Sequence, residues 1–254
     1  MEKRLRKILS EYGKLAIGYS GGVDSAYLMD VGTETLGKDN ILGVFFFSEF
    51  QTPEEKEDAL ALGLERNWNI EVIEDSVIEG LIQENPPNRC YYCKKKIFQR
   101  IYDKSLELGF TTVADGTNGS DIFEDRPGRV ALKELGVVSP LLEVGMTKND
   151  IRHFAKLRNL KPWNRPSNSC LATRIPSNQE INREDLFRIY QGEKFLKSLG
   201  FQLFRLRNHG ELARIMFSKN DWKLFLAMDK KEIKDGLSKF GFTFITVDIN
   251  EYGE

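Results

Sequence analysis

The sequence predicts an α/β fold: a parallel sheet covered by helices, followed by a smaller C-terminal α+β domain. Three observations lead to this prediction. Short apolar runs alternate with helical segments over the first two-thirds of the chain, a glycine-rich turn joins the first run to its helix, and prolines gather where the alternation stops. Alternation of strand and helix is typical of a parallel sheet that is buried on both faces.

The predicted strands are short, apolar and rich in β-branched and aromatic residues, which favour a buried sheet. The last helix of this part begins with Thr147 and Asp150 at capping-box spacing, a signal for a helix N-terminus. The predicted strands cover residues 14–19, 41–47, 70–73 and 111–114, and the predicted helices cover residues 25–36, 53–68, 97–108 and 147–160.

The pattern changes near residue 160. Pro162, Pro166 and Pro176 fall within fifteen residues and no proline follows them, which indicates an irregular connecting segment. We therefore expect a first domain over residues 1–165 and a second over 166–254, with 166–180 as the connecting segment. The second domain is predicted to hold a helix at 182–199, two short strands around residues 209–210 and a last strand at 242–247.

Composition excludes several classes of protein. The 254 residues include 37 Lys and Arg against 38 Asp and Glu, a net charge of −1 that argues against a globally basic nucleic-acid binder. Residues 1–14 are charged throughout and do not form a signal peptide. The longest apolar run, residues 41–47, is too short to span a bilayer. We expect a soluble, cytoplasmic protein that binds neither membranes nor nucleic acid.

The strongest chemical signal is the string Ser-Gly-Gly-Val-Asp-Ser at residues 20–25, directly after a strand and before a helix. Glycines let the backbone approach an anion closely, and a helix N-terminus supplies N–H groups and partial positive charge. The string lacks the spacing and the lysine of a Walker A loop. It therefore predicts a phosphate site of another kind.

The cysteines give the second signal. Cys90 and Cys93 form a C-x-x-C pair, and Cys170 stands alone. An odd number in a chain of this length is unlike a secreted disulfide framework, so the pair indicates metal, cluster or redox chemistry in a reducing compartment.

Residues 20–25 resemble the PP-loop of the N-type ATP pyrophosphatases, whose fold is the adenine nucleotide alpha hydrolase-like sheet. The resemblance implies that ATP is cleaved to AMP and pyrophosphate and that AMP passes to a substrate oxygen. It places Asp24 near Mg²⁺, residues 46–48 near the adenosine, and residues 115–118 in a second nucleotide-binding turn. The implied ATP and pyrophosphate site is Ser20, Gly21, Gly22, Val23, Asp24, Ser25, Phe46, Ser48, Gly116, Thr117 and Asn118.

Three further segments, at residues 125–128, 169–174 and 205–215, are similar to the LarE family of sulfur transferases, and the resemblance covers nearly the whole chain. It implies adenylation of a carboxylate of pyridinium-3,5-biscarboxylic acid mononucleotide and its conversion to a thiocarboxylate for the nickel-pincer nucleotide. In sacrificial members the sulfur comes from one protein cysteine, which corresponds to Cys170. Ser120 and Met216 stand where acidic residues are expected in this family.

Cys90 and Cys93 depart from the sacrificial pattern. Three thiolates, those of Cys90, Cys93 and Cys170, can hold three irons of a [4Fe–4S] cluster and leave the fourth open for a sulfide. Zinc bound by the three cysteines with His153 or His209 is an alternative. A sacrificial Cys170 with incidental neighbours is another.

The second domain offers a candidate site for the substrate phosphate. Arg205 and Arg207 alternate along a short strand and so point the same way, and we group them with Arg174. Glu193 either faces the same pocket or is solvated. His209 is expected to bond in a turn, and His153 to be exposed.

Several alternatives stay open for the function. A tRNA-thiolating PP-loop enzyme would use the same cluster, an amidating synthetase would need no such cysteines, and a non-catalytic nucleotide-binding iron–sulfur protein would release no pyrophosphate. For a sulfur transferase of this kind we expect ATP, Mg²⁺ and a [4Fe–4S] cluster, a small mononucleotide substrate, a sulfide donor and a homo-oligomer.

Overall fold

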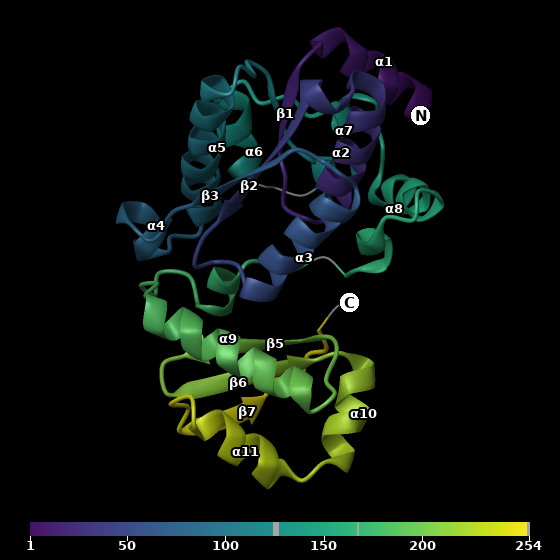
Figure 1. Cartoon of the computed structure of the whole chain (residues 1–254). Coiled ribbons are helices and arrows are strands. Elements are labelled where there is room, and N and C mark those ends of the chain that lie inside the picture. Colours follow the sequence, from purple (N-terminus) through teal and green to yellow (C-terminus); the bar gives the residue numbers. More distant parts are fainter. Residues whose placement is uncertain (124–126, 167, 253–254) are drawn as a thin grey trace. The chain divides into compact units, whose positions relative to one another are not determined.

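A computed structural model describes residues 1–123, 127–166 and 168–252 (Figure 1). Asp125 and Arg126, part of one motif above, lie outside these described residues. The chain divides into two compact units. Unit 1 comprises Met1–Val77 and Asn88–Asn168, and unit 2 comprises Ile78–Pro87 and Ser169–Glu254.

Unit 1 is built on the predicted parallel sheet, in the order β3-β2-β1-β4. Its strands are β1 (Leu15–Gly18), β2 (Ile41–Phe47), β3 (Ile70–Glu74) and β4 (Val113–Ala114). The chain moves outward from β1 through β2 to β3 and then returns to place β4 on the other side of β1. Open α/β sheets bind ligands at such a change of direction, beyond the carboxyl ends of the strands.

Helices cover both faces of this sheet (Figure 1), as predicted. On one face α2 packs on β1 and β2, with α1 and α8 packed on α2; on the other face α5 packs on β1, β2 and β4. The helical elements of unit 1 are α1 (Glu2–Tyr12), α2 (Val23–Leu36), η1 (Lys38–Asn40), α3 (Pro53–Glu65), α5 (Arg89–Glu107), η2 (Gly119–Phe123), α6 (Pro127–Glu134), α7 (Pro140–Glu143), α8 (Lys148–Leu157) and η3 (Lys161–Asn164).

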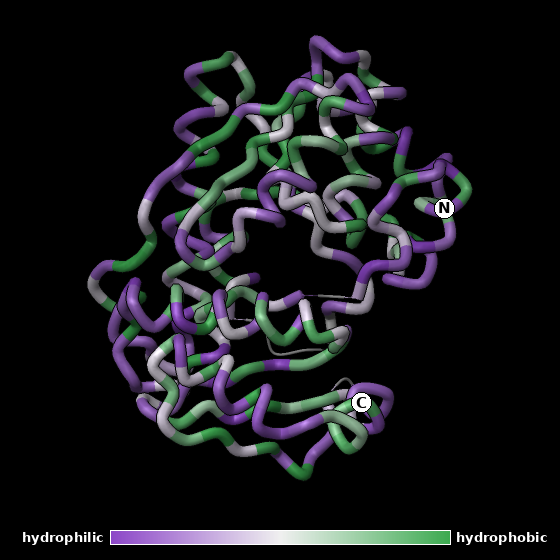
Figure 2. Tube along the Cα trace, turned by 60° about the horizontal axis from the view of Figure 1, so that its bottom comes forward, coloured by the Kyte–Doolittle hydropathy of each residue, from purple (hydrophilic) through white to green (hydrophobic). Residues whose placement is uncertain are grey.

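The core of unit 1 lies between the sheet and α2. Leu15, Ile17 and Ile41 are fully buried there. Figure 2 shows the hydrophobic and hydrophilic segments along the Cα trace. The helix α3 ends three residues earlier than predicted. Asn67 takes a left-handed conformation with φ of 53°, which a continuing helix does not tolerate.

Unit 2 holds a three-stranded mixed sheet with helices. The strand β5 (Phe204–His209) is antiparallel to β6 (Leu212–Phe217), and β7 (Phe244–Val247) is parallel to β6. Leu206, Ile215 and Phe217 point into a core that is closed by α9. The helical elements are α4 (Gly80–Glu84), η4 (Leu171–Arg174), α9 (Arg183–Ser198), α10 (Lys219–Ala227) and α11 (Lys230–Ser238).

Residues 78–87 pack with unit 2 although the sequence prediction assigned them to residues 1–165. Asn85 is fully buried, and its side-chain amide donates to the carbonyls of Pro176 and Gln179 at 2.8 and 3.0 Å. The backbone N–H of Ile181 donates to the carbonyl of Gln83 at 2.8 Å. These bonds join the α4 segment to the segment that follows Cys170.

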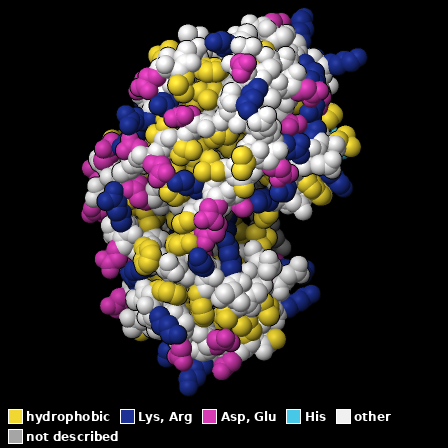
Figure 3. All heavy atoms as spheres, in the orientation of Figure 1, with side chains coloured by type: hydrophobic (Ala, Val, Ile, Leu, Met, Phe, Trp, Pro, Cys, Tyr) yellow, Lys and Arg dark blue, Asp and Glu magenta, His cyan; other side chains and the backbone are white. Residues whose placement is uncertain are grey.

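The distribution of surface charge and the character of the helices agree with the composition. Lys and Arg side chains lie intermixed with Asp and Glu on the face shown in Figure 3, and no extended region there carries one sign of charge. Within the described residues, no helix combines the length and the apolar character needed to cross a bilayer.

An ion-pair network joins α1, α2 and α8. Arg158 donates to Glu2 and to Asp30, each at 2.8 Å, and Glu2 also accepts from the Tyr27 hydroxyl at 3.1 Å. The hydrogen bonds from Arg158 are the main reason that the pKa of Glu2 falls from 4.5 to about 2. The network therefore stabilises unit 1 whenever Glu2 is ionised.

We predict that Glu2→Gln lowers the free energy of unfolding by about 1 kcal/mol at pH 7, a value reduced for solvent screening of a partly exposed pair. A carboxylate with a depressed pKa stabilises the fold above its unfolded pKa of about 4.5. The difference between variant and wild type should therefore shrink as the pH falls from about 4.5 toward 2. Urea denaturation across this range measures it. Glu11→Gln, on the exposed face of α1, is the control; an equal loss in both variants, or one independent of pH, would contradict the prediction.

Candidate functional site

The turn from β1 to α2 has the backbone geometry of an anion site. Gly21 has a φ of +73°, and a Cβ there would lie 2.6 Å from the Cβ of Ala59, so only glycine fits. Gly22 is the N-cap of α2 and has no side chain to occupy the first N–H groups of the helix. Those groups therefore remain available for a phosphate.

Two serines hold this turn in shape. The backbone N–H of Ser20 donates to the Ser25 hydroxyl oxygen at 3.1 Å, and the two hydroxyl oxygens are 3.2 Å apart. The Ser25 hydroxyl also donates to the Gly22 carbonyl at 3.2 Å. The turn is thus closed on itself before any ligand arrives.

Asp24 is the charged group of the turn. One carboxylate oxygen, Oδ2, accepts from the ammonium of Lys148. The other, Oδ1, is buried and has no hydrogen-bond partner among the described residues. Burial raises the pKa of Asp24, while Lys148 and, more weakly, Arg152 oppose that change. A buried carboxylate oxygen without a partner is well suited to a hard divalent cation such as Mg²⁺.

A second loop at residues 115–118 packs against the same turn. A Cβ on Gly116 would lie 3.1 Å from the Cβ of Asp24 and 3.2 Å from the backbone nitrogen of Ser25. Asp115 is buried and accepts from the hydroxyls of Thr117 and Ser139. Of the nucleotide residues expected from the sequence, residues 20–25 and Gly116 therefore lie together, with Thr117 beside Gly116 in the same loop.

The next residue of this loop connects it to α8. Asn118 is buried, and its side-chain oxygen accepts from the backbone N–H of Ser120 at 2.9 Å. Ser120 in turn accepts from the backbone N–H of Lys148 at 3.0 Å. Ser120, which stands in place of an acidic residue, therefore caps the first N–H of α8 and fixes the start of that helix.

Phe46 lies near the end of β2 and Ser48 directly after it, and both are buried. Gln51 caps the strand end: its amide donates to the Phe46 carbonyl at 2.9 Å, and its side-chain oxygen accepts from the Ser48 N–H at 2.9 Å. These bonds to Gln51 hold the end of the strand in place.

Cys90 and Cys93 lie one turn apart near the start of α5, with Cys90 exposed and Cys93 partly buried. Side chains three residues apart on a helix share a face, so the structure brings these two thiols together. Cys170 belongs to unit 2, where it precedes η4. None of the three forms a disulfide. Within the described residues, no group of three or more His, Cys, Asp or Glu side chains is arranged to hold a metal ion.

The histidines of the zinc alternative lie in different units. His153 is exposed on α8, as expected. His209 ends β5, and its Nε2 is buried with no hydrogen-bond partner in the described part of the chain, so this nitrogen makes no turn bond. Burial, together with Arg214 and Arg207, lowers the pKa of His209.

Unit 2 contains a cavity of about 120 Å³ lined by the three arginines expected from the sequence. Three arginines are crowded around this one cavity, and burial, together with neighbouring arginines, lowers the pKa of Arg205 and of Arg207. A bound anion would relieve this crowding. The lining residues are Ser169, Thr173, Arg174, Arg205, Arg207 and Tyr252.

Arg174 differs from the other two arginines because it is 2% exposed and has its own counter-charge. Its Nε donates to Glu193 at 2.9 Å, and another nitrogen donates to the carbonyl of Cys170 at 3.0 Å. Glu193 also accepts from the backbone N–H of Leu206 at 3.2 Å. The solvated role considered for Glu193 is therefore wrong: it is a buried partner of Arg174.

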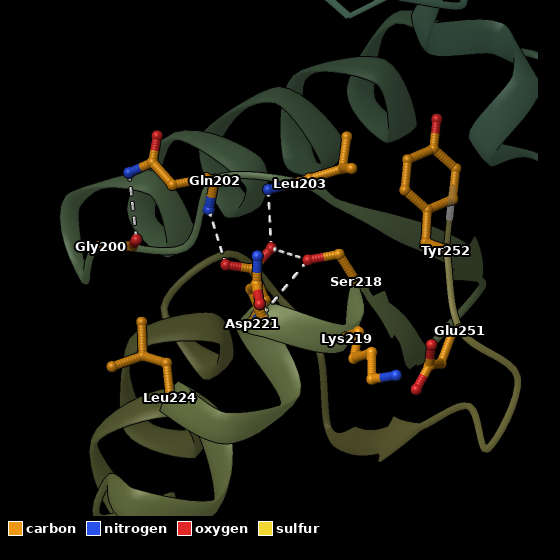
Figure 4. Close-up of a pocket in the computed structure, with 10 residues that line it drawn as sticks. Gly200, Gln202, Leu203, Ser218, Lys219, Asp221, Leu224, Glu251 and Tyr252 are labelled. Atoms are coloured by element: carbon orange, nitrogen blue, oxygen red, sulfur yellow. Dashed lines mark hydrogen bonds between the residues drawn. The ribbon is translucent and has the colours of Figure 1, made fainter. Parts of the chain in front are cut away.

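A larger cavity of about 460 Å³ in unit 2 was not expected from the sequence (Figure 4). Asp221 is buried in its wall and accepts from the backbone N–H groups of Gln202 and Leu203, at 2.9 and 2.7 Å, and from the Ser218 hydroxyl at 2.8 Å. Because each of its oxygens is occupied, Asp221 joins the start of α10 to the residues before β5. The spacing Ser-x-x-Asp at 218–221 is the sequence signal for this cap.

The comparisons with known proteins agree with this geometry. Residues 1–86 match the NAD synthase family. The chain is 34% identical over 252 residues to the uncharacterized protein slr1717 of Synechocystis sp., covering 98% of this chain and 94% of that protein. It is 30% identical over 245 residues to the pyridinium-3,5-bisthiocarboxylic acid mononucleotide synthase of Lactiplantibacillus plantarum, covering 96% of this chain and 88% of the synthase. The match to NAD synthase is confined to the part with the PP-loop, whereas these two relatives match over both units, and the chain therefore belongs to the LarE-type family of PP-loop enzymes.

Proposed function

We propose that the protein is an ATP-dependent sulfur transferase acting on pyridinium-3,5-biscarboxylic acid mononucleotide. The observation that carries the proposal is the PP-loop, with the buried Oδ1 of Asp24, in a chain that aligns over 96% of its length with a pyridinium-3,5-bisthiocarboxylic acid mononucleotide synthase. The product would be a thiocarboxylate for the nickel-pincer nucleotide.

The reaction would proceed in two displacements. A carboxylate oxygen of the substrate attacks the α-phosphorus of ATP, and pyrophosphate leaves with the electron pair of the broken P–O bond. A sulfide then attacks the acyl carbon, and AMP leaves with the former carboxylate oxygen. Adenylation is needed because an oxide ion is a poor leaving group and AMP is a good one.

In the first displacement the turn at residues 20–25 would bind the phosphates through the N–H groups of α2, and Asp24 Oδ1 would hold Mg²⁺. Mg²⁺ supplies charge neutralisation of the phosphate oxygens. Phe46, Ser48, Gly116, Thr117 and Asn118 would position the rest of the nucleotide, and the rigid bonding of the second loop supports that role.

The phosphate of the mononucleotide would bind in the arginine cavity of unit 2. Arg205 and Arg207 supply the positive charge there, while Arg174 is already neutralised by Glu193 and holds the carbonyl of Cys170. This contact links the phosphate site to the cysteine segment by side chains within one unit.

For the sulfur we propose a [4Fe–4S] cluster held by Cys90, Cys93 and Cys170, recharged by a sulfide donor. Three cysteine thiolates are suitable ligands for such a cluster, since they leave one iron open to carry a sulfide. Cys90 and Cys93 share a helix face, and Cys90 and Cys170 each lie within three residues of a point where the chain passes between the units. Zinc, or a sacrificial Cys170, is the competing assignment.

We predict that wild type releases pyrophosphate from ATP only when the mononucleotide is present, and that Asp24→Asn lowers this rate by about 100-fold through loss of charge at the metal position. A coupled pyrophosphate assay measures it. Asp103→Asn, on the exposed surface of α5, is the matched control. Pyrophosphate release triggered by tRNA would assign the chain to tRNA thiolation, and absence of release with either substrate would favour a non-catalytic protein.

We predict that anaerobically purified wild type contains iron and acid-labile sulfide, and that alanine at any one of the three cysteines removes most of both, because a cluster with two protein ligands is weakly held. Metal analysis and mass spectrometry are the measurements. Zinc without sulfide would overturn the cluster, as would dehydroalanine at Cys170 after a single turnover.

We predict that the double variant Arg205→Met, Arg207→Met raises the KM for the mononucleotide by at least about tenfold and leaves the KM for ATP unchanged, since charge-assisted bonds to phosphate are lost at one site only. Lys234→Met, on an exposed position of α11, serves as the control. An equal rise in both KM values would argue against a substrate phosphate in this cavity.

A further inference from the structure

The first residue of α8, Lys148, faces the PP-loop although no sequence motif pointed to it. Its ammonium pairs with Oδ2 of Asp24, and the side chains of Lys148 and Asp24 are partly buried, at 28% and 21% exposure. The pair joins two segments that are 124 residues apart in the chain. Lys148 is therefore a second charged group of the nucleotide site.

A lysine at this position works against the helix that carries it. The N-terminus of a helix bears partial positive charge, so cations there are unfavourable. Thr147 and Asp150 nevertheless form a complete capping box, and Ser120 accepts the backbone N–H of Lys148 at 3.0 Å. The backbone of Lys148 is thus fixed on two sides, while its flexible side chain extends from this anchor to the PP-loop.

Arg152 adds a second cation one turn further along α8. It lies on the same face of the helix as Lys148, and its Nε is buried with no hydrogen-bond partner among the described residues. Another of its nitrogens donates to the carbonyl of Arg165 at 2.9 Å. Two cations therefore approach a turn that offers them the one carboxylate of Asp24, with Asp121 as a further acidic group in the surroundings.

We propose that Lys148 is a phosphate-binding residue that exchanges partners. Without bound nucleotide, its ammonium forms an ion pair with the carboxylate of Asp24. When ATP and Mg²⁺ enter the site, the carboxylate takes the metal and the ammonium moves to the β- and γ-phosphate oxygens, where it stabilises the departing pyrophosphate. The inference rests on the proposed ATP site and adds a residue to it.

The geometry favours exchange over a permanent ion pair. A salt bridge kept for stability has no need of an orphaned oxygen, yet Oδ1 of Asp24 has no partner in the described residues. A lysine kept only as a counter-ion would also lie on an element that favours positive charge, and the start of α8 does not. The adjacent N–H groups of α2, left without a side-chain cap, mark where the phosphates would lie.

The test is a double-mutant cycle on the binding of α,β-methylene ATP, which cannot be cleaved, measured by calorimetry with Mg²⁺ and with EDTA. With Mg²⁺, Lys148→Met and Asp24→Asn should each weaken binding by about tenfold. With EDTA, Asp24→Asn should bind about tenfold tighter than wild type, because Lys148 is released to the phosphates. The double variant should lose that gain.

Lys148→Arg should keep most of the affinity, and Lys156→Met, on the exposed face of α8, should keep all of it. If Lys148 only neutralises Asp24, the double variant will bind in EDTA as tightly as Asp24→Asn, and the proposal fails. If wild type does not bind the analogue with Mg²⁺, the ATP site itself is wrong. Circular dichroism of each variant confirms that the fold is retained.

Discussion

The pairing of β1 with β2 on one side and β4 on the other is the constraint on which unit 1 depends. Because β1 and β4 are parallel neighbours, the segments that follow their carboxyl ends lie at the same edge of the sheet. Gly116 permits their close approach, because a Cβ there would press against Asp24 and Ser25, while Gly21 lets the turn after β1 pass close to Ala59 of α3. The proposed nucleotide site thus depends on the strand order, and its residues come from distant parts of the chain.

An ion pair lies at the candidate site of each unit, and the two pairs differ in burial and in whether all their polar atoms are bonded. In unit 2, Glu193 neutralises the deeply buried Arg174 and the pair holds the backbone at Cys170 in place. Removing one partner of such a pair would strand a charge and cost several kcal/mol. In unit 1, Asp24 and Lys148 are less buried, and one carboxylate oxygen of Asp24 has no hydrogen-bond partner in the part of the chain that the structure describes. The first pair suits a structural role, and the second suits a group that changes partners.

Much of the fold could be predicted because local signals agreed with the tertiary structure. The parallel sheet, the PP-loop turn, the capping box at Thr147 and the strands around residue 209 are confirmed. The placement of residues 78–87 could not be predicted, because it depends on bonds from Asn85 to a segment some ninety residues away. The role of Lys148 could not be predicted for the same reason: nothing in the sequence near the capping threonine indicates that this lysine contacts Asp24.

The α4 segment has a consequence for how this protein can be divided. Its neighbours on both sides in the chain belong to unit 1, while its own partners are in unit 2, so the chain passes between the units three times. Cutting the gene once would not yield two self-sufficient halves, because the first would carry α4 with Ile82 and Asn85 stripped of their surroundings. Recombination could not exchange unit 2 as one continuous piece of the gene either, because unit 2 consists of two separate segments of the chain. The two units are therefore expected to evolve as one inheritable block, which accords with relatives that align over nearly their entire length.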